Sequence, residues 1–285
     1  MPVTCDDYHL HSHYCDGQGE LTEWIEVALA RRLSGIGFSS HAPVAFPTDW
    51  TMPLRRLPRY VAEVRELQAH YRRRLEVCLG LELDFVPGLA SFQQQHILGQ
   101  PLDYVIGAVH FVGGEGSAVP WSVDGPAQLF DRGLREEYGG DILALVGEYY
   151  RRVRAMLHTG HASVVGHLDR ILRNNVGERY FGQSAAWYRR EVEDTLQVVA
   201  ARQTILGFNT AGWYTPVGLP NPSPWVLPCC RELGIRVTLG SDAHRPEHLG
   251  RGLLRAMQLL RQVGYKEVWR FRSGVWEPSR LADAD

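Results

Sequence analysis

The sequence predicts an α/β fold in which helices connect seven parallel strands that form a closed or nearly closed barrel. Three observations support it. Seven short runs of apolar and small residues recur along the 285-residue chain, and segments with helical periodicity fill most of the gaps between them. Hydrophobic residues make up 45% and charged residues 22%, as in ordinary globular proteins. Regular alternation of strand and helix is typical of βαβ units, and seven such units favour a barrel over an open sheet.

The predicted strands are continuously apolar rather than alternating, which is typical of strands buried on both faces. In chain order they cover residues 4–11, 35–41, 75–82, 104–110, 163–167, 204–209 and 236–242.

The predicted helices show apolar residues at helical spacing, as with Leu21, Ile25 and Ala28 in the first. They cover residues 21–32, 54–74, 142–157, 184–202, 224–233 and 249–263. Residues 113–140 are rich in Gly and Pro and predict a long loop with a short helix. Residues 267–272 alternate and predict a final edge strand. No composition break marks a linker, so we expect residues 1–285 to form one domain.

Charge and composition limit the kinds of binding partner and the cellular compartment that we expect for this protein. The formal net charge is −2, so no overall attraction draws the chain to nucleic acid or to an anionic membrane. No apolar stretch reaches the ~20 residues of a membrane-spanning helix, no secretory signal is visible, and the five cysteines form no CxxC motif. We therefore expect a cytoplasmic protein with free thiols. Lys266 is the single lysine among 30 basic residues, so any cationic contact with an anionic substrate must come from arginine.

Side chains able to bind metal stand at or just beyond the ends of most predicted strands. They are His9, His11, Asp16, His41, Glu82, His110, His167, Asp242 and His244. The carboxyl ends of the strands meet on one face of a parallel barrel, where active sites form. In His9-x-His11 and Asp242-x-His244 the two side chains point the same way, because side chains alternate along a strand.

The ligand types predict a cluster of two or three divalent ions. Imidazole and carboxylate together suit Zn, Fe or Mn. Nine groups are too many for one ion, and a carboxylate such as Glu82 can bridge two. A lone HxH is more often structural than metal-binding, but placement at so many strand ends is hard to obtain by chance.

The same residues carry a resemblance to a known family. The motifs are Asp7-Tyr8-His9-Leu10-His11-Ser12 with Cys15-Asp16-Gly17, Ser40-His41, Gly80-Leu81-Glu82, Gly107-Ala108-Val109-His110-Phe111, Gly166-His167-Leu168-Asp169, Asn209-Thr210 and Gly240-Ser241-Asp242-Ala243-His244. Together they resemble the PHP (polymerase and histidinol phosphatase) superfamily, and within it the monofunctional histidinol-phosphate phosphatases. The resemblance extends from His9 to His244.

This resemblance implies a distorted (β/α)7 barrel and three metal positions. By similarity, His9, His11, Glu82 and Asp242 hold one ion, Glu82, His110 and His167 a second, and Asp16, His41 and His244 a third. We expect catalytic roles for Glu82, Asp242 and His244. The implied reaction is hydrolysis of L-histidinol phosphate to L-histidinol and phosphate in histidine biosynthesis.

The mechanistic hypothesis is in-line attack of a metal-bound hydroxide on the phosphate, because phosphoryl transfer needs charge neutralisation and positioning more than covalent help. Arg170 and Arg245 are the candidate phosphate contacts, and Asp169 is expected to orient His167 or Arg170. The Gly113–Gly116 loop is expected to fold over the substrate, with Glu115 near its ammonium group.

Other functions remain open. A PHP-type nucleic-acid phosphodiesterase or 3′ exonuclease would use the arginine clusters at residues 72–74 and 151–154, although it also predicts a basic groove that the net charge does not favour. A phosphatase for another small phosphomonoester is a second alternative. An amidohydrolase-type barrel would often use a bridging lysine, and Lys266 lies beyond the last metal-competent strand. A metal-stabilised scaffold without activity is a fourth. The oligomeric state cannot be inferred.

Overall fold

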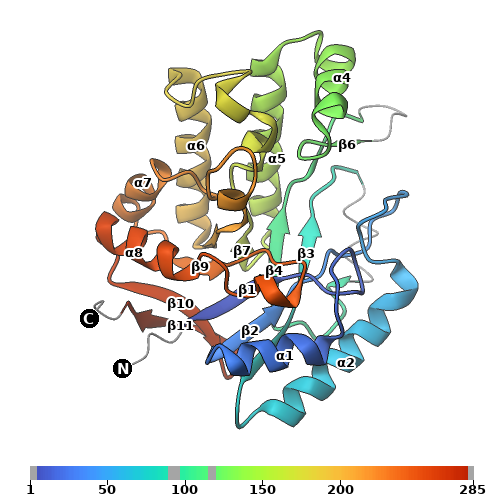
Figure 1. The fold of residues 1–285 in the computed structure, drawn as a ribbon. Helices are drawn as coiled ribbons and strands as arrows, with labels where there is room; N and C mark the ends of the chain where they lie inside the picture. The colour runs from blue at the N-terminus through green and yellow to red at the C-terminus, as the bar shows by residue number, and fades with distance from the viewer. Residues whose placement is uncertain (1–4, 89–96, 115–119, 282–285) are drawn as a thin grey trace.

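The structure, a computed structural model, describes residues 5–88, 97–114 and 120–281. Its centre is a sheet of seven parallel strands (Figure 1) that lie in chain order, β1 (Asp6–Leu10), β2 (Gly35–Phe38), β3 (Glu76–Asp84), β4 (Tyr104–Ala108), β7 (Val164–Val165), β8 (Ile205–Asn209) and β9 (Val237–Gly240). The sheet curls so that β9 returns to β1. Leu10 bridges to Ala243, and the N–H of His11 donates to the carbonyl of Ala243 at 2.9 Å. The predicted barrel is confirmed.

All seven predicted strands are present, but their ends differ from the expected ones. β2 stops at Phe38, three residues before His41, whereas β3 continues two residues past Glu82 to Asp84. His41 still meets Glu82 through an isolated parallel bridge. The regular ladder therefore ends where the metal-competent side chains gather.

Helices cover the outside of the barrel (Figure 1). The α-helices that lie within the described residues are α1 (Leu21–Ala30), α2 (Leu57–Tyr71), α4 (Ala127–Tyr138), α5 (Ile142–Thr159), α6 (Ala186–Arg202), α7 (Val226–Glu232) and α8 (Leu253–Val263). Short 3₁₀ helices are η1 (Leu54–Arg56), η2 (Arg170–Asn174), η3 (Val176–Glu178), η4 (Ala211–Tyr214) and η5 (Pro246–His248). Asp141 caps α5 by accepting hydrogen bonds from the N–H groups of Leu143 and Ala144. Within the described residues, no helix is long and apolar enough to span a bilayer.

The segment expected to be mainly loop contains more regular structure than predicted. The short strands β5 (Phe111–Val112) and β6 (Trp121–Ser122) pair antiparallel, and the twelve-residue α4 follows. Phe130 and Leu134 of α4 pack into the core. Glycines and a proline at both ends of α4 gave the segment the composition of a loop.

The predicted edge strand is wrong in its placement. β10 (Glu267–Arg272) is a strand, but it pairs antiparallel with β11 (Val275–Arg280) in a separate two-stranded sheet. Phe271 of β10 packs with Tyr8 and Tyr104 of the barrel. The hairpin therefore contributes apolar side chains to the barrel core instead of extending the sheet.

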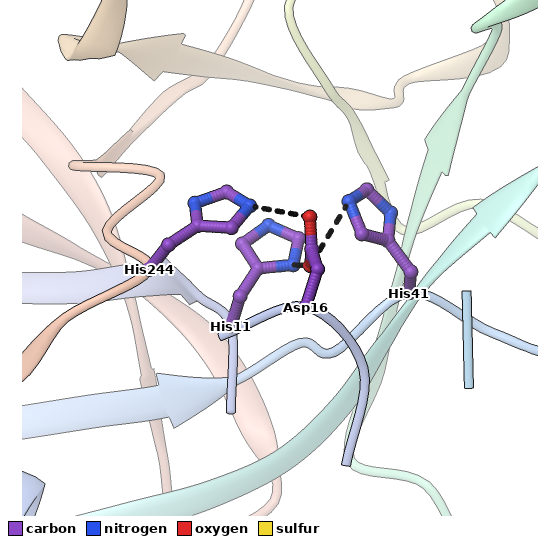
Figure 2. A group of neighbouring side chains, drawn as sticks. All are labelled: His11, Asp16, His41 and His244. Atoms are coloured by element: carbon purple, nitrogen blue, oxygen red, sulfur yellow. Dashed lines mark ion pairs between the residues drawn. The ribbon is translucent and has the colours of Figure 1, made fainter. Parts of the chain in front are cut away.

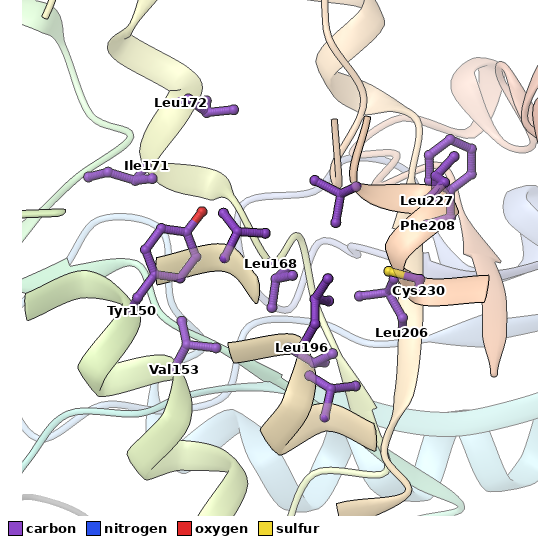
Figure 3. Packing of buried hydrophobic residues seen from close by; sticks show 14 of the residues in the cluster. Tyr150, Val153, Leu168, Ile171, Leu172, Leu196, Leu206, Phe208, Leu227 and Cys230 are labelled. Carbon is purple, nitrogen blue, oxygen red and sulfur yellow. The ribbon is translucent and has the colours of Figure 1, made fainter. Parts of the chain in front are cut away.

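Two larger clusters of buried residues hold the helices to the barrel. One lies between the sheet and the helices α5 to α8, and it includes Tyr150, Leu196 and Leu206 (Figure 3). The other lies under α1 and α2 and includes Trp24 and Tyr60. Glycine is needed where the Tyr104 ring crosses the barrel, since a β-carbon at Gly80 would lie 2.5 Å from the ring. These contacts make the barrel a rigid support for the residues at its rim.

Candidate metal centre

The nine predicted ligands come from separate elements and gather at the carboxyl end of the barrel. His9 is within β1, His11 and Asp16 follow it, His41 follows β2, Glu82 is within β3, His110 follows β4, His167 follows β7, and Asp242 and His244 follow β9. Seven of them are buried, whereas Asp16 and His244 lie at the solvent-facing rim.

The Glu82 carboxylate lies among five imidazoles. Its Oε2 is 3.2 Å from Nε2 of His9, 3.4 Å from Nε2 of His11 and 3.1 Å from Nδ1 of His41. Its Oε1 is 2.7 Å from Nε2 of His167 and 3.8 Å from Nε2 of His110. Burial acts to raise the pKa of Glu82, but the surrounding histidines outweigh it and hold the pKa well below its usual range. Glu82 is therefore an anion with two oxygens facing different ligand groups, the arrangement a bridging carboxylate needs.

The Asp242 carboxylate lies close to His9 and His11, two of the histidines that also contact Glu82. Its Oδ1 lies 3.0 Å from Nε2 of His11 and 3.7 Å from Nε2 of His9. His9, His11 and Asp242 therefore form one compact group that could hold an ion.

A second group lies nearer the rim (Figure 2). Oδ2 of Asp16 is 3.3 Å from Nε2 of His244, and Oδ1 lies 3.9 Å from Nδ1 of His11 and 4.0 Å from Nε2 of His41. His11 and His41 thus present one ring nitrogen to Asp16 and the other to the Glu82 side. The rim group and the buried groups share these two imidazoles.

The geometry and the unpaired atoms fit divalent ions. Zinc binds His nitrogen at about 2.0–2.1 Å with tetrahedral geometry, so two of its ligand atoms lie roughly 3.3 Å apart. Several nitrogen-to-oxygen distances around Glu82 and Asp242 fall between 3.0 and 3.4 Å. Within the described part of the chain, the buried Nε2 of His11 and Nδ1 of His41 make no hydrogen bond. Since unpaired buried polar atoms are costly, an ion coordinated by them would satisfy both.

Protonation states also favour metal binding at several positions. Burial lowers the pKa of His11 and of His41, and it lowers the pKa of His167 to about 4, so these rings are neutral ligands at physiological pH. His110 differs. Burial opposes its protonation, but the Asp84 carboxylate raises the pKa of His110 to about 10.

The supporting roles of two residues were not predicted. Asp84 lies 2.9 Å from Nδ1 of His110 and accepts its backbone N–H, and Asn209 donates to Oδ2 of Asp242 at 2.9 Å. Both fix the orientation of a candidate ligand. The sequence does contain a signal for Asp84, because Glu82-x-Asp84 repeats the same-face spacing of His9-x-His11.

The candidate phosphate arginines differ in placement. Arg170 enters the site, with Nε 2.6 Å from Oδ2 of Asp124 and Nη1 3.4 Å from Oδ2 of Asp242. Arg245 is exposed, and its guanidinium makes no hydrogen bond or ion pair with the residues described. Asp124, which holds Arg170, was not predicted, because nothing in its loop sequence marks it.

The expected role of Asp169 is wrong. Its carboxylate accepts hydrogen bonds from Nδ2 of Asn221 at 2.8 Å and from the backbone N–H of Ser223 at 2.7 Å. It therefore anchors the loop before α7 rather than orienting His167 or Arg170. The expected contact of Glu115 with the substrate lies outside the described residues.

Comparison with known proteins agrees with this geometry. Residues 7–211 match the family model for the PHP domain. The chain belongs to the PHP domain family. It is 35% identical over 282 residues to a protein of Deinococcus radiodurans named probable histidinol-phosphatase, an alignment that covers 98% of this chain and all of the relative. It is 25% identical to the histidinol-phosphatase of Lactococcus lactis, over 93% of each chain.

A solved structure has the same fold. It is the histidinol phosphate phosphatase of Lactococcus lactis in complex with Zn, L-histidinol and phosphate. The two structures superpose with a TM-score of 0.71 at 24% identity, covering 96% of this chain and 99% of the other.

Proposed function

We propose that this PHP-family chain is a metal-dependent phosphomonoesterase that hydrolyses L-histidinol phosphate to L-histidinol and phosphate, as a cytoplasmic enzyme of histidine biosynthesis. The observation that carries the proposal is the ring of five imidazoles around the buried Glu82 carboxylate. The choice of substrate rests on the names of the full-length relatives and on the ligands bound in the Lactococcus structure.

The ligand groups suit two or three ions of Zn, Fe or Mn. His9, His11, Glu82 and Asp242 would hold one, Glu82 with His167 and His110 a second, and Asp16, His41 and His244 a third, so that Glu82 would bridge the first two. When bound, such ions neutralise phosphate oxygens and lower the pKa of water toward neutrality. Glu82, Asp242 and His244 are the catalytic residues of the proposal because they would touch these ions.

Two arginines of η2 are the phosphate contacts of the proposal. In a 3₁₀ helix, residues three apart lie on the same face, so Arg173 projects beside Arg170. Two carboxylates already contact Arg170. Half-buried Arg173 makes no ion pair within the described residues, and burial together with the nearby Arg170 charge lowers its pKa. An anion is the natural partner of such a cation, so we infer that Arg173 contacts the phosphate together with Arg170, and that Arg245 contributes less.

The test is a comparison of kcat/KM over a panel of small phosphomonoesters that includes L-histidinol phosphate, using metal-loaded protein. We expect L-histidinol phosphate to exceed the others by at least about tenfold, since specific polar contacts to the substrate are worth 1.4 kcal/mol or more. Treatment with a strong chelator should abolish turnover, and Zn, Mn or Fe should restore it. A flat profile would leave only a generic phosphatase, and unchanged turnover in metal-free protein would refute the mechanism.

Nucleic-acid hydrolysis remains the alternative. Part of its sequence support disappears in the structure. Arg152 is buried and donates to the carbonyls of Phe111 and Gly113, and Arg154 pairs with Glu191 at 2.9 Å. Neither is free to line a basic groove. Salt-dependent binding of single-stranded DNA would favour this alternative, and its absence would disfavour it.

A further inference from the structure

An arginine-lined pocket lies beside the metal centre and plays no part in the proposed reaction. It has a volume of about 400 Å³ and is lined by His13, Tyr14, Glu20, Arg55, Arg56 and Arg59. The walls come from the loop that follows β1 and from η1 with the first turn of α2. The volume is within the range of small-molecule sites, roughly 300–1,000 Å³.

The charges of the pocket are poorly compensated. Three guanidinium groups face one lining carboxylate, that of Glu20, which is 71% exposed and lies 3.9 Å from Nδ1 of His13. The nearby carboxylate of Glu63 accepts the hydroxyl hydrogen of Tyr14. Among the described residues, Arg55, Arg56 and Arg59 form no ion pair with any carboxylate. Three exposed guanidinium groups around one carboxylate make the pocket locally positive, which favours an anionic ligand.

Arg56 is held in place without being neutralised. Its Nη1 donates to the carbonyl of His13 at 3.0 Å and to the carbonyl of Tyr14 at 3.4 Å, and its guanidinium lies 6.0 Å from the centre of the Tyr14 ring. Carbonyl oxygens fix the position of the group but leave its full charge. Such a positioned, uncompensated arginine is suited to bind a phosphate or phosphonate group.

We propose that this pocket is a second anion site, which binds a small molecule carrying a phosphate-like dianion. Arg55 and Arg59 bind the dianion together with Arg56. The organic part of the ligand occupies the remaining volume and packs against the Tyr14 ring. The site is distinct from the metal centre, because none of its lining residues is a candidate metal ligand. The carbonyls that hold Arg56 belong to the segment between His11 and Asp16, so a bound ligand rests against the loop that carries Asp16.

The experiment is a calorimetric titration of the metal-loaded protein with phenylphosphonate. This probe carries a phosphate-like dianion on an aromatic group and cannot be hydrolysed as a phosphomonoester. The pocket variant is Arg55→Ala with Arg59→Ala, both exposed, and it spares Arg56 because that residue holds the loop. The matched control is Arg72→Ala with Arg73→Ala, which removes two exposed arginines beyond the other end of α2.

We expect wild-type protein to bind phenylphosphonate at the metal centre and in the pocket. The pocket variant should lose at least tenfold in affinity at one of these two sites and stay within twofold at the other. The control should keep both affinities within twofold of wild type. A pocket variant that titrates like wild type, or a control that loses as much, would overturn the proposal. The readout involves no turnover, so failure of the proposed phosphatase activity would leave this test unaffected.

Discussion

The Asp84 carboxylate holds His110 through both the ring and the main chain. Its Oδ1 lies 2.9 Å from Nδ1 of the imidazole and 3.0 Å from the backbone nitrogen of the same residue. The two contacts fix the ring so that Nε2 faces Glu82. The orientation of a candidate metal ligand is therefore set by a residue that was not among the nine predicted.

Replacing Asp84 with Asn should weaken metal binding at His110. The loss of a supporting carboxylate typically costs 10–100-fold in metal affinity or activity. We expect Asp84→Asn to retain less metal after dialysis, measured by atomic emission, and to lose kcat in proportion. Asp194→Asn, at an exposed position of α6, is the control. Full metal content with unchanged kcat would show that the Asp84 carboxylate is not required for metal binding at His110.

Replacing Glu82 with Ala should remove more than one ion. The two Glu82 oxygens face different histidines, with Oε2 near His9 and Oε1 near His167. We expect the metal-to-protein ratio of Glu82→Ala to fall by more than one, with activity lost. Near-ultraviolet circular dichroism would check that the barrel still folds, and the exposed Glu232→Ala is the control. A loss of one ion or fewer would argue against bridging.

Metal binding should release protons. Asp84 raises the pKa of His110 to about 10, and a hydrogen bond to Asp16 raises the pKa of His244 to about 9, in both cases against the effect of burial. At pH 8 the metal-free protein therefore carries these protons, and an ion must displace them to coordinate the rings.

Two measurements check the proton release. Zinc added to metal-free protein in weak buffer should lower the pH, and His244→Ala should release about one proton fewer than wild type. Because protons compete with the metal for these two histidines, zinc affinity should rise between pH 7 and 9 as the protons are lost. Affinity that falls over this range would contradict the assignment.

Arg173 and Arg245 should differ in their effect on substrate binding. A hydrogen bond to a charged group is worth about 1.5–3 kcal/mol, or roughly 10–100-fold. We expect Arg173→Ala to raise KM for L-histidinol phosphate by about tenfold or more, because this arginine forms no ion pair with the residues that the structure describes. The exposed Arg245→Ala should stay close to wild type. Steady-state kinetics distinguish the two, and equal KM changes would refute the inference.

Gly240 should be intolerant of a larger side chain. A β-carbon there would lie 2.5 Å from Cβ of His9, so Gly240→Ala must displace a candidate ligand or strain the barrel. Overpacking typically costs 1–3 kcal/mol. Urea unfolding should show this loss together with reduced metal content. Gly147→Ala in α5 is the matched control, since its nearest neighbour is 3.8 Å away and alanine favours the helix. Equal stability of the two variants would contradict the packing argument.

The sequence predicted the barrel and the gathering of the nine candidate ligands because both follow from local patterns. Buried strands appear as apolar runs, and candidate ligands such as His41 and His167 follow them directly. The sequence did not predict contacts between loops that are distant in the chain and meet only in the folded structure. Asp124 reaches Arg170 across 46 residues of sequence, and Asp169 turns to Asn221 instead of its neighbours. α4 was underestimated because composition at its ends outweighed the helical pattern of its buried side.

Closure of the barrel by β1 and β9 joins segments that lie far apart in the sequence. During synthesis, His9 and His11 emerge from the ribosome long before Asp242 and His244. The Leu10–Ala243 bridge cannot form until β9 has been made. A nascent chain that has not yet reached Asp242 thus lacks part of the candidate ion site, and we expect metal binding only after this segment has been translated.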